Sequence, residues 1–200
     1  MQSIENTILA SIKKCGRGNL FFAQDFSSKG SALAIQKSLE RLVEKKILVR
    51  VARGIYYYPK HDKVLGIDLL PTYEHIAMAI AKRDKARIVP TGLYALNRLG
   101  LSTQVPTSFV YLTDGTPRNI HIADGYGIEF RKAPLKTFAY HNELLRMIVL
   151  ALKTLGQENI TSVEERRIKE LMQLVSETAF KQDCALMPIW IRTYLSKFYE

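Results

Sequence analysis

Three positively charged side chains recur at four-residue intervals in the segment 31–46. Lys37, Arg41 and Lys45 are each about one helical turn apart, and apolar residues between them form a second helical stripe. Lysine and arginine on an exposed helix face contact the phosphates of nucleic acid and, in the major groove, the edge of guanine. The chemistry that this pattern favours is therefore recognition of a polyanion.

A short hairpin is predicted directly after that helix. β-rich runs at 48–51 and 55–58 flank Arg53 and Gly54, and glycine permits the sharp reversal between them. Arg50 and Arg53 at the tip are expected to contact phosphates beside the groove that the helix enters. The residues that we expect to contact double-stranded DNA are Ser31, Ala34, Lys37, Ser38, Arg41, Lys45, Lys46, Arg50 and Arg53.

Two neighbouring features keep alternatives open. Leu33 falls toward the exposed side of the helix, where it packs against the preceding helix or touches a thymine methyl group. The run Tyr56-Tyr57-Tyr58 either stacks on bases or alternates between core and surface of an edge strand.

The preceding elements complete a known arrangement. A helix is expected over residues 3–15, a short strand over 19–22 and a brief second helix over 23–28, and Ser31 is a suitable N-cap for the third helix. The order helix, strand, helix, helix, strand, strand predicts that residues 1–63 form an N-terminal winged helix-turn-helix.

Residues 64–200 predict a second domain. The segment 59–71 is expected to be the linker, and Asp-Gly pairs between later β runs favour an antiparallel meander. Helices are expected at 73–83, 91–99, near 144–152, 162–175 and 188–198, and β runs at 87–89, 108–112, 118–122 and 128–131. The predicted fold class is therefore α+β, a winged helix-turn-helix followed by a C-terminal domain with a small antiparallel sheet and several helices.

Charge and cysteine content support this division. Residues 1–63 contain 12 Lys and Arg against 5 Asp and Glu, a balance of +7, whereas residues 64–200 contain 17 against 14, a balance of +3. Concentrated positive charge attracts polyanions through counterion release. Cys15 and Cys184 suggest neither a disulfide framework nor a zinc site, so we expect a cytoplasmic protein. The longest apolar stretch, 147–152, is too short to cross a membrane, so we expect no membrane association.

Two motifs carry a resemblance to a known family. They are RVARGIYY at 50–57 and PTGLYALNRLGLSTQVP at 90–106, the latter followed by YLTDG at 111–115. The chain resembles the short form of the AbiEi-type antitoxins of bacterial abortive-infection (type IV) toxin–antitoxin systems. The resemblance implies binding to inverted repeats upstream of its own operon, repression of transcription, and a C-terminal domain directed against a cognate nucleotidyltransferase-like toxin. The C-terminal domain is shorter than in the better-studied relatives, so repression transfers more directly than antitoxicity.

Other interpretations are weaker but distinct. A polar surface for a partner is expected at Asn97, Arg98, Ser102, Thr103 and Gln104, although the same residues suit a packed loop.

Asp124, Glu129 and the pair Arg131-Lys132 resemble the acidic pair and lysine of a metal-dependent nuclease, but Asp124 lies in an Asp-Gly turn. We therefore predict a protein that is not an enzyme and needs no metal or cofactor. A DNA-binding regulator without a toxin partner, and a monomer or homodimer, stay open.

Overall fold

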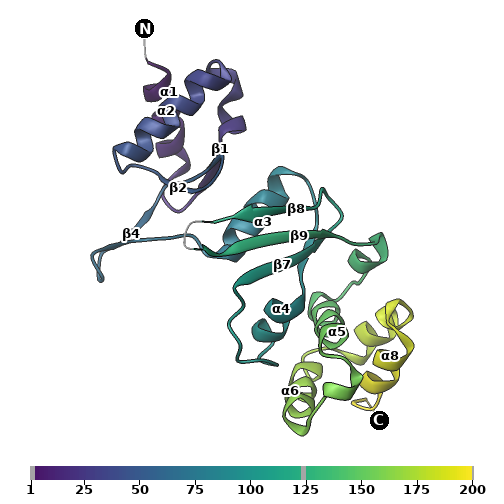
Figure 1. Cartoon of the computed structure of the whole chain (residues 1–200). Helices are drawn as coiled ribbons and strands as arrows, with labels where there is room; N and C mark the ends of the chain where they lie inside the picture. The colour runs from purple at the N-terminus through teal and green to yellow at the C-terminus, as the bar shows by residue number, and fades with distance from the viewer. Residues whose placement is uncertain (1–2, 123–124, 200) are drawn as a thin grey trace. The chain divides into compact units, whose positions relative to one another are not determined.

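The computed structural model describes residues 3–122 and 125–199. The fold is α+β with three small sheets (Figure 1). Contacts divide the chain into two compact units, residues 1–80 with 121–125, and residues 81–120 with 126–200. This division falls within helix α3 (Tyr73–Arg83). The functional division expected between residues 63 and 64 stays a prediction.

The first unit begins with three helical segments around one apolar core. They are α1 (Ile4–Cys15), the 3₁₀ segment η1 (Ala23–Lys29) and α2 (Ala32–Glu44). Ser31 is the N-cap of α2, since its hydroxyl accepts the Ala34 N–H at 3.4 Å. The buried core residues are Ile8, Ile12, Phe21, Phe26, Ile35, Leu39, Leu42, Leu48, Tyr56 and Tyr58. The predicted apolar stripe of α2 is thus confirmed.

Three short strands close this core. They are β1 (Leu20–Phe22), β2 (Val49–Ala52) and β3 (Ile55–Tyr57), in the spatial order β1-β3-β2 with antiparallel pairing throughout. A two-residue turn joins β2 to β3, and Gly54 adopts φ 74°, which is a left-handed conformation that favours glycine. The Ala23 N–H donates to the Gly54 carbonyl at 3.4 Å and ties the turn to η1.

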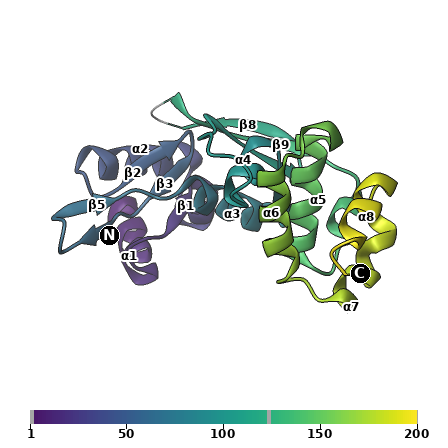
Figure 2. The ribbon, with the colours of Figure 1, turned by 90° about the horizontal axis from the view of Figure 1, so that it is seen from below.

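The segment expected to be a linker is instead a β-hairpin. Strands β4 (Lys60–Asp62) and β5 (Ile67–Leu69) pair antiparallel (Figure 2). The carboxylate of Asp62 accepts the Val64 and Leu65 N–H groups at 2.8 and 3.0 Å, which fixes the turn. Strands of three residues are too short for alternation to be recognised in the sequence.

The sheet of the second unit is mixed, so the predicted antiparallel meander is wrong. Strands β6 (Ile88–Pro90), β7 (Ser108–Thr113), β8 (Arg118–His121) and β9 (Gly127–Lys132) have the order β6-β7-β9-β8. β7 pairs with β9 in parallel, from Ser108 opposite Gly127 to Thr113 opposite Lys132.

Burial accounts for this order. β7 and β9 carry the buried rings of Tyr111 and Phe130, whose centroids are 6.0 Å apart. β8 contributes exposed polar side chains at Asn119 and His121, which are best accommodated on an edge strand. Placing the apolar strands side by side therefore overrides the tendency of consecutive strands to pair in sequence order.

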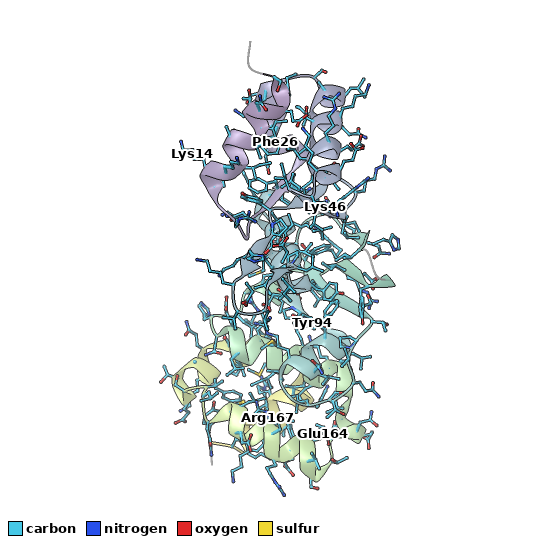
Figure 3. The ribbon with its side chains drawn as sticks, turned by 90° about the vertical axis from the view of Figure 1, so that its left-hand side faces the viewer. Lys14, Phe26, Lys46, Tyr94, Glu164 and Arg167 are labelled. Carbon is cyan, nitrogen blue, oxygen red and sulfur yellow. The ribbon has the colours of Figure 1, made fainter. Side chains whose placement is uncertain are left out.

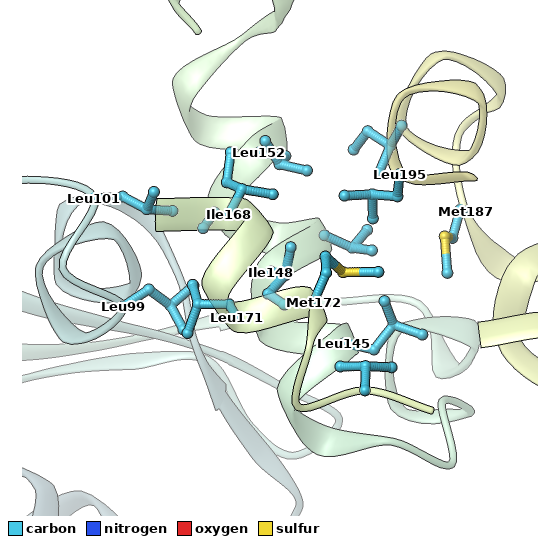
Figure 4. Close-up of a cluster of buried hydrophobic side chains, with 14 of the residues drawn as sticks. Leu99, Leu101, Leu145, Ile148, Leu152, Ile168, Leu171, Met172, Met187 and Leu195 are labelled. Carbon is cyan, nitrogen blue, oxygen red and sulfur yellow. The ribbon is translucent and has the colours of Figure 1, made fainter. Parts of the chain in front are cut away.

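Helices form the rest of the second unit, and its α-helices share a large apolar cluster. They are α4 (Gly92–Arg98), α5 (Glu143–Leu155), α6 (Ser162–Met172), α7 (Glu177–Asp183) and α8 (Ile189–Ser196), with 3₁₀ segments η3 (Leu135–Phe138), η4 (Gln157–Asn159) and η5 (Cys184–Leu186). Figure 4 shows Ile148 and Leu152 of α5 facing Ile168 of α6 within this cluster. The capping box of α6 is formed by Thr161 and Glu164. Across residues 3–122 and 125–199, none of the helices combines the length and apolar character needed to cross a membrane.

A buried carboxylate links α7 to the start of α5. Asp183 is fully buried and accepts the backbone N–H groups of His141 at 3.0 Å and Asn142 at 2.9 Å, and its Oδ1 lies 2.9 Å from His141 Nδ1. Burial opposes ionisation of Asp183, but these hydrogen bonds outweigh it and hold its pKa below the usual value. The negative charge also lies at the N-terminus of α5, where the helix dipole favours it.

We expect Asp183→Asn to lower the free energy of unfolding by about 2–3 kcal/mol, because one amide oxygen replaces two acceptor oxygens. Because the folded pKa lies below the unfolded value of about 3.9, the stabilisation is present above pH 4 and is lost as pH falls further. The difference in the free energy of unfolding between wild type and Asp183→Asn should therefore become smaller below about pH 4, as measured by urea titrations followed by circular dichroism.

The control is Glu177→Gln, which removes an exposed ion pair with Lys181 on the same helix and should cost less than about 0.5 kcal/mol. Equal stability of Asp183→Asn and wild type at pH 7 would contradict the assignment.

Candidate nucleic-acid interface

The solvent-facing side of α2 carries a limited set of side chains. Ile35, Leu39 and Leu42 are buried in the core, which directs Leu33 and Lys37 outward. Leu33 is 62% exposed, so most of its side chain faces solvent rather than the preceding helical segment. Among the alternatives left open by the sequence, the structure favours a Leu33 available to a ligand.

Arg41 and Lys45 are turned toward α1 rather than straight outward. Glu5 of α1 forms an ion pair with Lys45 and lies 3.7 Å from the Arg41 guanidinium. A four-residue step advances about 40° around an α-helix, so the series that begins at Lys37 winds toward α1. The hydrogen bond from Lys45, with the charges of Lys45 and Arg41, holds the pKa of Glu5 below its usual value despite partial burial.

The three small residues among the expected DNA contacts differ in their exposure. Ser38 is 5% exposed and its hydroxyl donates to the Ala34 carbonyl at 2.8 Å, so we remove it from the expected DNA contacts. Ala34 is half-buried, and Ser31 is exposed at the N-cap of α2. The burial of Ser38 arises from the packing of α2 against the neighbouring elements.

The hairpin contributes two exposed cations. Arg50 of β2 and Arg53 of the turn are both exposed. Within the described part of the chain, neither has an ion-pair partner, and the same holds for Lys37 and Lys46. Acidic residues lie farther along α2, at Glu40 and Glu44. The positive surface therefore comprises the N-terminal half of α2 and the β2–β3 turn.

The tyrosines after this turn are not available to bases. Tyr56, Tyr57 and Tyr58 are 2%, 4% and 8% exposed, so neither base stacking nor alternation between core and surface applies. Tyr57 makes an edge-to-face contact with His75 of α3, their centroids 6.3 Å apart. Both faces of β3 are therefore covered within the first unit.

The expected partner surface in the second unit is a loop held by its own hydrogen bonds. The Asn97 amide donates to the carbonyls of Ser102 and Gln104 at 3.3 and 3.1 Å, and the Ser102 hydroxyl accepts the Gln104 N–H at 3.2 Å. Asn97 and Ser102 thus shape the loop. Thr103 and Gln104 are exposed on it, and Arg98 is exposed at the end of α4. Both the packed loop and the partner surface are compatible with this arrangement.

The nuclease alternative gains no support from the described side chains. Glu129 forms two hydrogen bonds of 2.7 Å with the guanidinium of Arg131, which holds the pKa of Glu129 below its usual value. Asp124 lies outside the described residues. In the ranges 3–122 and 125–199, no three His, Cys, Asp or Glu side chains form a group able to hold a metal ion.

Comparison with protein families now adds one finding. A family model described as "Family of unknown function (DUF6088)" matches residues 7–180. The chain belongs to this family. A search of curated proteins found no significant match. The DUF6088 match runs from α1 to α7 and therefore includes both the basic surface and the loop after α4.

The residue that sequence reasoning missed in this DUF6088 protein is Glu5. We expect Glu5→Gln to release Arg41 and Lys45 and so to raise the salt concentration at which the protein elutes from a heparin column. The control is Glu44→Gln, which changes the net charge equally but leaves the Glu5 pairs intact. Equal elution of the two variants would show that Glu5 does not restrain these cations.

Proposed function

We propose that the protein is a DNA-binding transcriptional repressor whose first unit contains a winged helix-turn-helix. The order α1-β1-η1-α2-β2-β3 and the sheet order β1-β3-β2 support this assignment. In such a fold, the helix before the hairpin enters the major groove and the hairpin lies beside the backbone. α2 and the β2–β3 hairpin are the corresponding elements.

The observation that carries the proposal is the exposed N-terminal half of α2. Leu33 and Lys37 project from this half, and Gln36 is exposed beside them. Lysine can donate to the O6 and N7 atoms of guanine, a glutamine amide can pair with adenine, and an apolar side chain can contact a thymine methyl group. A major groove about 12 Å wide admits a helix of this size.

The hairpin suits backbone contacts rather than base recognition. Arg53 is exposed in the β2–β3 turn, which is tied to η1 through Gly54, whereas Arg50, expected at the tip, is exposed within β2 opposite Tyr56. A rigid turn can hold a guanidinium against a phosphate at little entropic cost. Arg41 and Lys45, neutralised in part by Glu5, have a smaller role in this proposal than Lys37.

Fluorescence anisotropy with DNA from upstream of the protein's own gene tests the proposal that the protein is a repressor. Specific binding that survives scrambled competitor DNA is expected, and Lys37→Ala should weaken it by about 1–3 kcal/mol, roughly five- to 150-fold. Arg53→Ala should weaken binding to the upstream DNA and to the scrambled DNA alike. It should also reduce the slope of the logarithm of the binding constant against the logarithm of the salt concentration by about one.

The matched control is Lys14→Ala, which removes an exposed lysine of α1 (Figure 3) and should change affinity little. Circular dichroism checks that each variant is folded. If wild type binds both DNAs equally and weakly, and salt abolishes the binding, the repressor proposal fails.

We further propose that the second unit neutralises a toxin encoded next to this gene. This part rests on the resemblance of residues 90–106 to AbiEi-type antitoxins, and the exposed loop residues Thr103 and Gln104 supply a polar surface for such a partner. The partner would be a nucleotidyltransferase-like protein.

Co-purification with the product of the neighbouring gene tests this second role. Gln104→Arg should reduce the recovered partner at least tenfold and leave DNA affinity unchanged. Gln182→Arg is the control, because it introduces the same side chain at an exposed position of α7. Failure of the wild-type protein to bind that product would reject the antitoxin role and leave the repressor proposal standing.

A further inference from the structure

A second basic site lies in the first unit, at the end of β3 opposite the hairpin turn. It is a pocket of 310 Å³, and its lining residues are Lys13, Arg17, Lys46, Ile47, Tyr58, Pro59, His61 and Asp68. A volume near 300 Å³ is that of a small-molecule site. All of these residues belong to the same compact unit.

The pocket is remote from the surface proposed to contact bases. α2 has 13 residues and is therefore about 20 Å long. Leu33 and Lys37 lie in its N-terminal half, whereas Lys46 follows its C-terminus. Likewise, Gly54 and Tyr58 lie at opposite ends of β3. Two basic regions at opposite ends of the same elements indicate two separate ligands.

One wall of the pocket is preorganised. The Arg17 guanidinium donates to the Pro59 carbonyl at 2.9 Å and lies 4.7 Å from the centroid of the Tyr58 ring. Arginine has five N–H donors, so others stay available to a ligand. On the hairpin, His61 Nδ1 lies 3.1 Å from Asp68 Oδ1. The carboxylate of Asp68 in the pocket wall is therefore paired with His61.

The two lysines of the pocket are not needed to cap the helices that carry them. At the end of α1, the Gly16 N–H and the Asn19 amide already donate to the last carbonyls. At the end of α2, the N–H groups of Lys46 and Ile47 donate to Val43 and Leu42. Lys13 and Lys46 have no ion-pair or hydrogen-bond partner for their ammonium groups within the described ranges.

The backbone of Lys46 adds an independent observation. Its φ of 56° lies in the left-handed region, at the position after a helix where glycine is strongly favoured. A lysine at this position costs free energy that glycine would avoid. Strain that persists at a pocket is consistent with a requirement for the side chain itself.

We infer that this pocket binds the phosphate groups of a small molecule. The Arg17 guanidinium can donate to two phosphate oxygens in a fork, and Lys13 and Lys46 line the same pocket as further point charges. A pocket of this size is too small for a duplex. The inference goes beyond DNA binding and gives the first unit a separate site for a phosphorylated effector.

The probe is inorganic pyrophosphate, titrated into the full-length protein by calorimetry and by thermal denaturation. Wild type should bind it and show a higher Tm than in NaCl of equal ionic strength. Lys13→Gln and Lys46→Gly should each weaken binding at least fivefold. Lys46→Gly should not lower the Tm of the free protein, because it relieves the positive φ.

Two controls separate this site from its surroundings. Lys85→Gly relieves the same backbone conformation, since Lys85 has φ 53° after α3, and should leave pyrophosphate binding unchanged. Lys37→Ala, on the surface proposed to contact DNA, should leave it unchanged as well, whether or not the repressor proposal holds.

Three outcomes would overturn the inference. In the first, pyrophosphate stabilises the wild type no more than NaCl does. In the second, all four variants bind it as wild type does, which indicates diffuse charge. In the third, Lys13→Gln and Lys46→Gly weaken DNA binding but not pyrophosphate binding, which indicates that the pocket contacts the DNA backbone.

Discussion

The burial of one stripe of α2 is the constraint on which the first unit depends. Ile35, Leu39 and Leu42 are almost completely removed from solvent against α1 and η1, and burial of each such side chain contributes about 1.5–3 kcal/mol. This packing fixes the rotation of α2 about its axis. It therefore decides that Leu33 and Lys37 face outward and that Arg41 and Lys45 meet Glu5.

The distribution of charge follows from that rotation. Net charge alone would spread attraction for a polyanion over the whole first unit, whereas Glu5 and the acidic end of α2 restrict it. What results is one basic region at the start of α2 with the β2–β3 turn and another in the pocket beyond its end. The length of α2 separates these two basic regions.

The second unit is stabilised both by an apolar cluster and by a buried, hydrogen-bonded carboxylate. Its helices share one apolar cluster, and the single fully buried carboxylate described there, Asp183, is satisfied by backbone N–H groups before α5. A buried charge is tolerated only where hydrogen bonds replace its hydration. The loop after α4 is likewise fixed by the Asn97 amide. Its exposed side chains are therefore presented on a shaped surface, which a protein partner requires.

Local sequence rules determined much of this protein. The span of α2, its Ser31 cap and the turn at Gly54 follow from helical periodicity, side-chain capping and glycine conformation, which act within a few residues. The parallel pairing of β7 with β9, the burial of Ser38 and the Glu5 pairs depended on the tertiary structure. Each of these involves segments distant in the chain or the exact rotation of a helix, and the free energy that selects them comes from burying apolar side chains together, which no local pattern encodes.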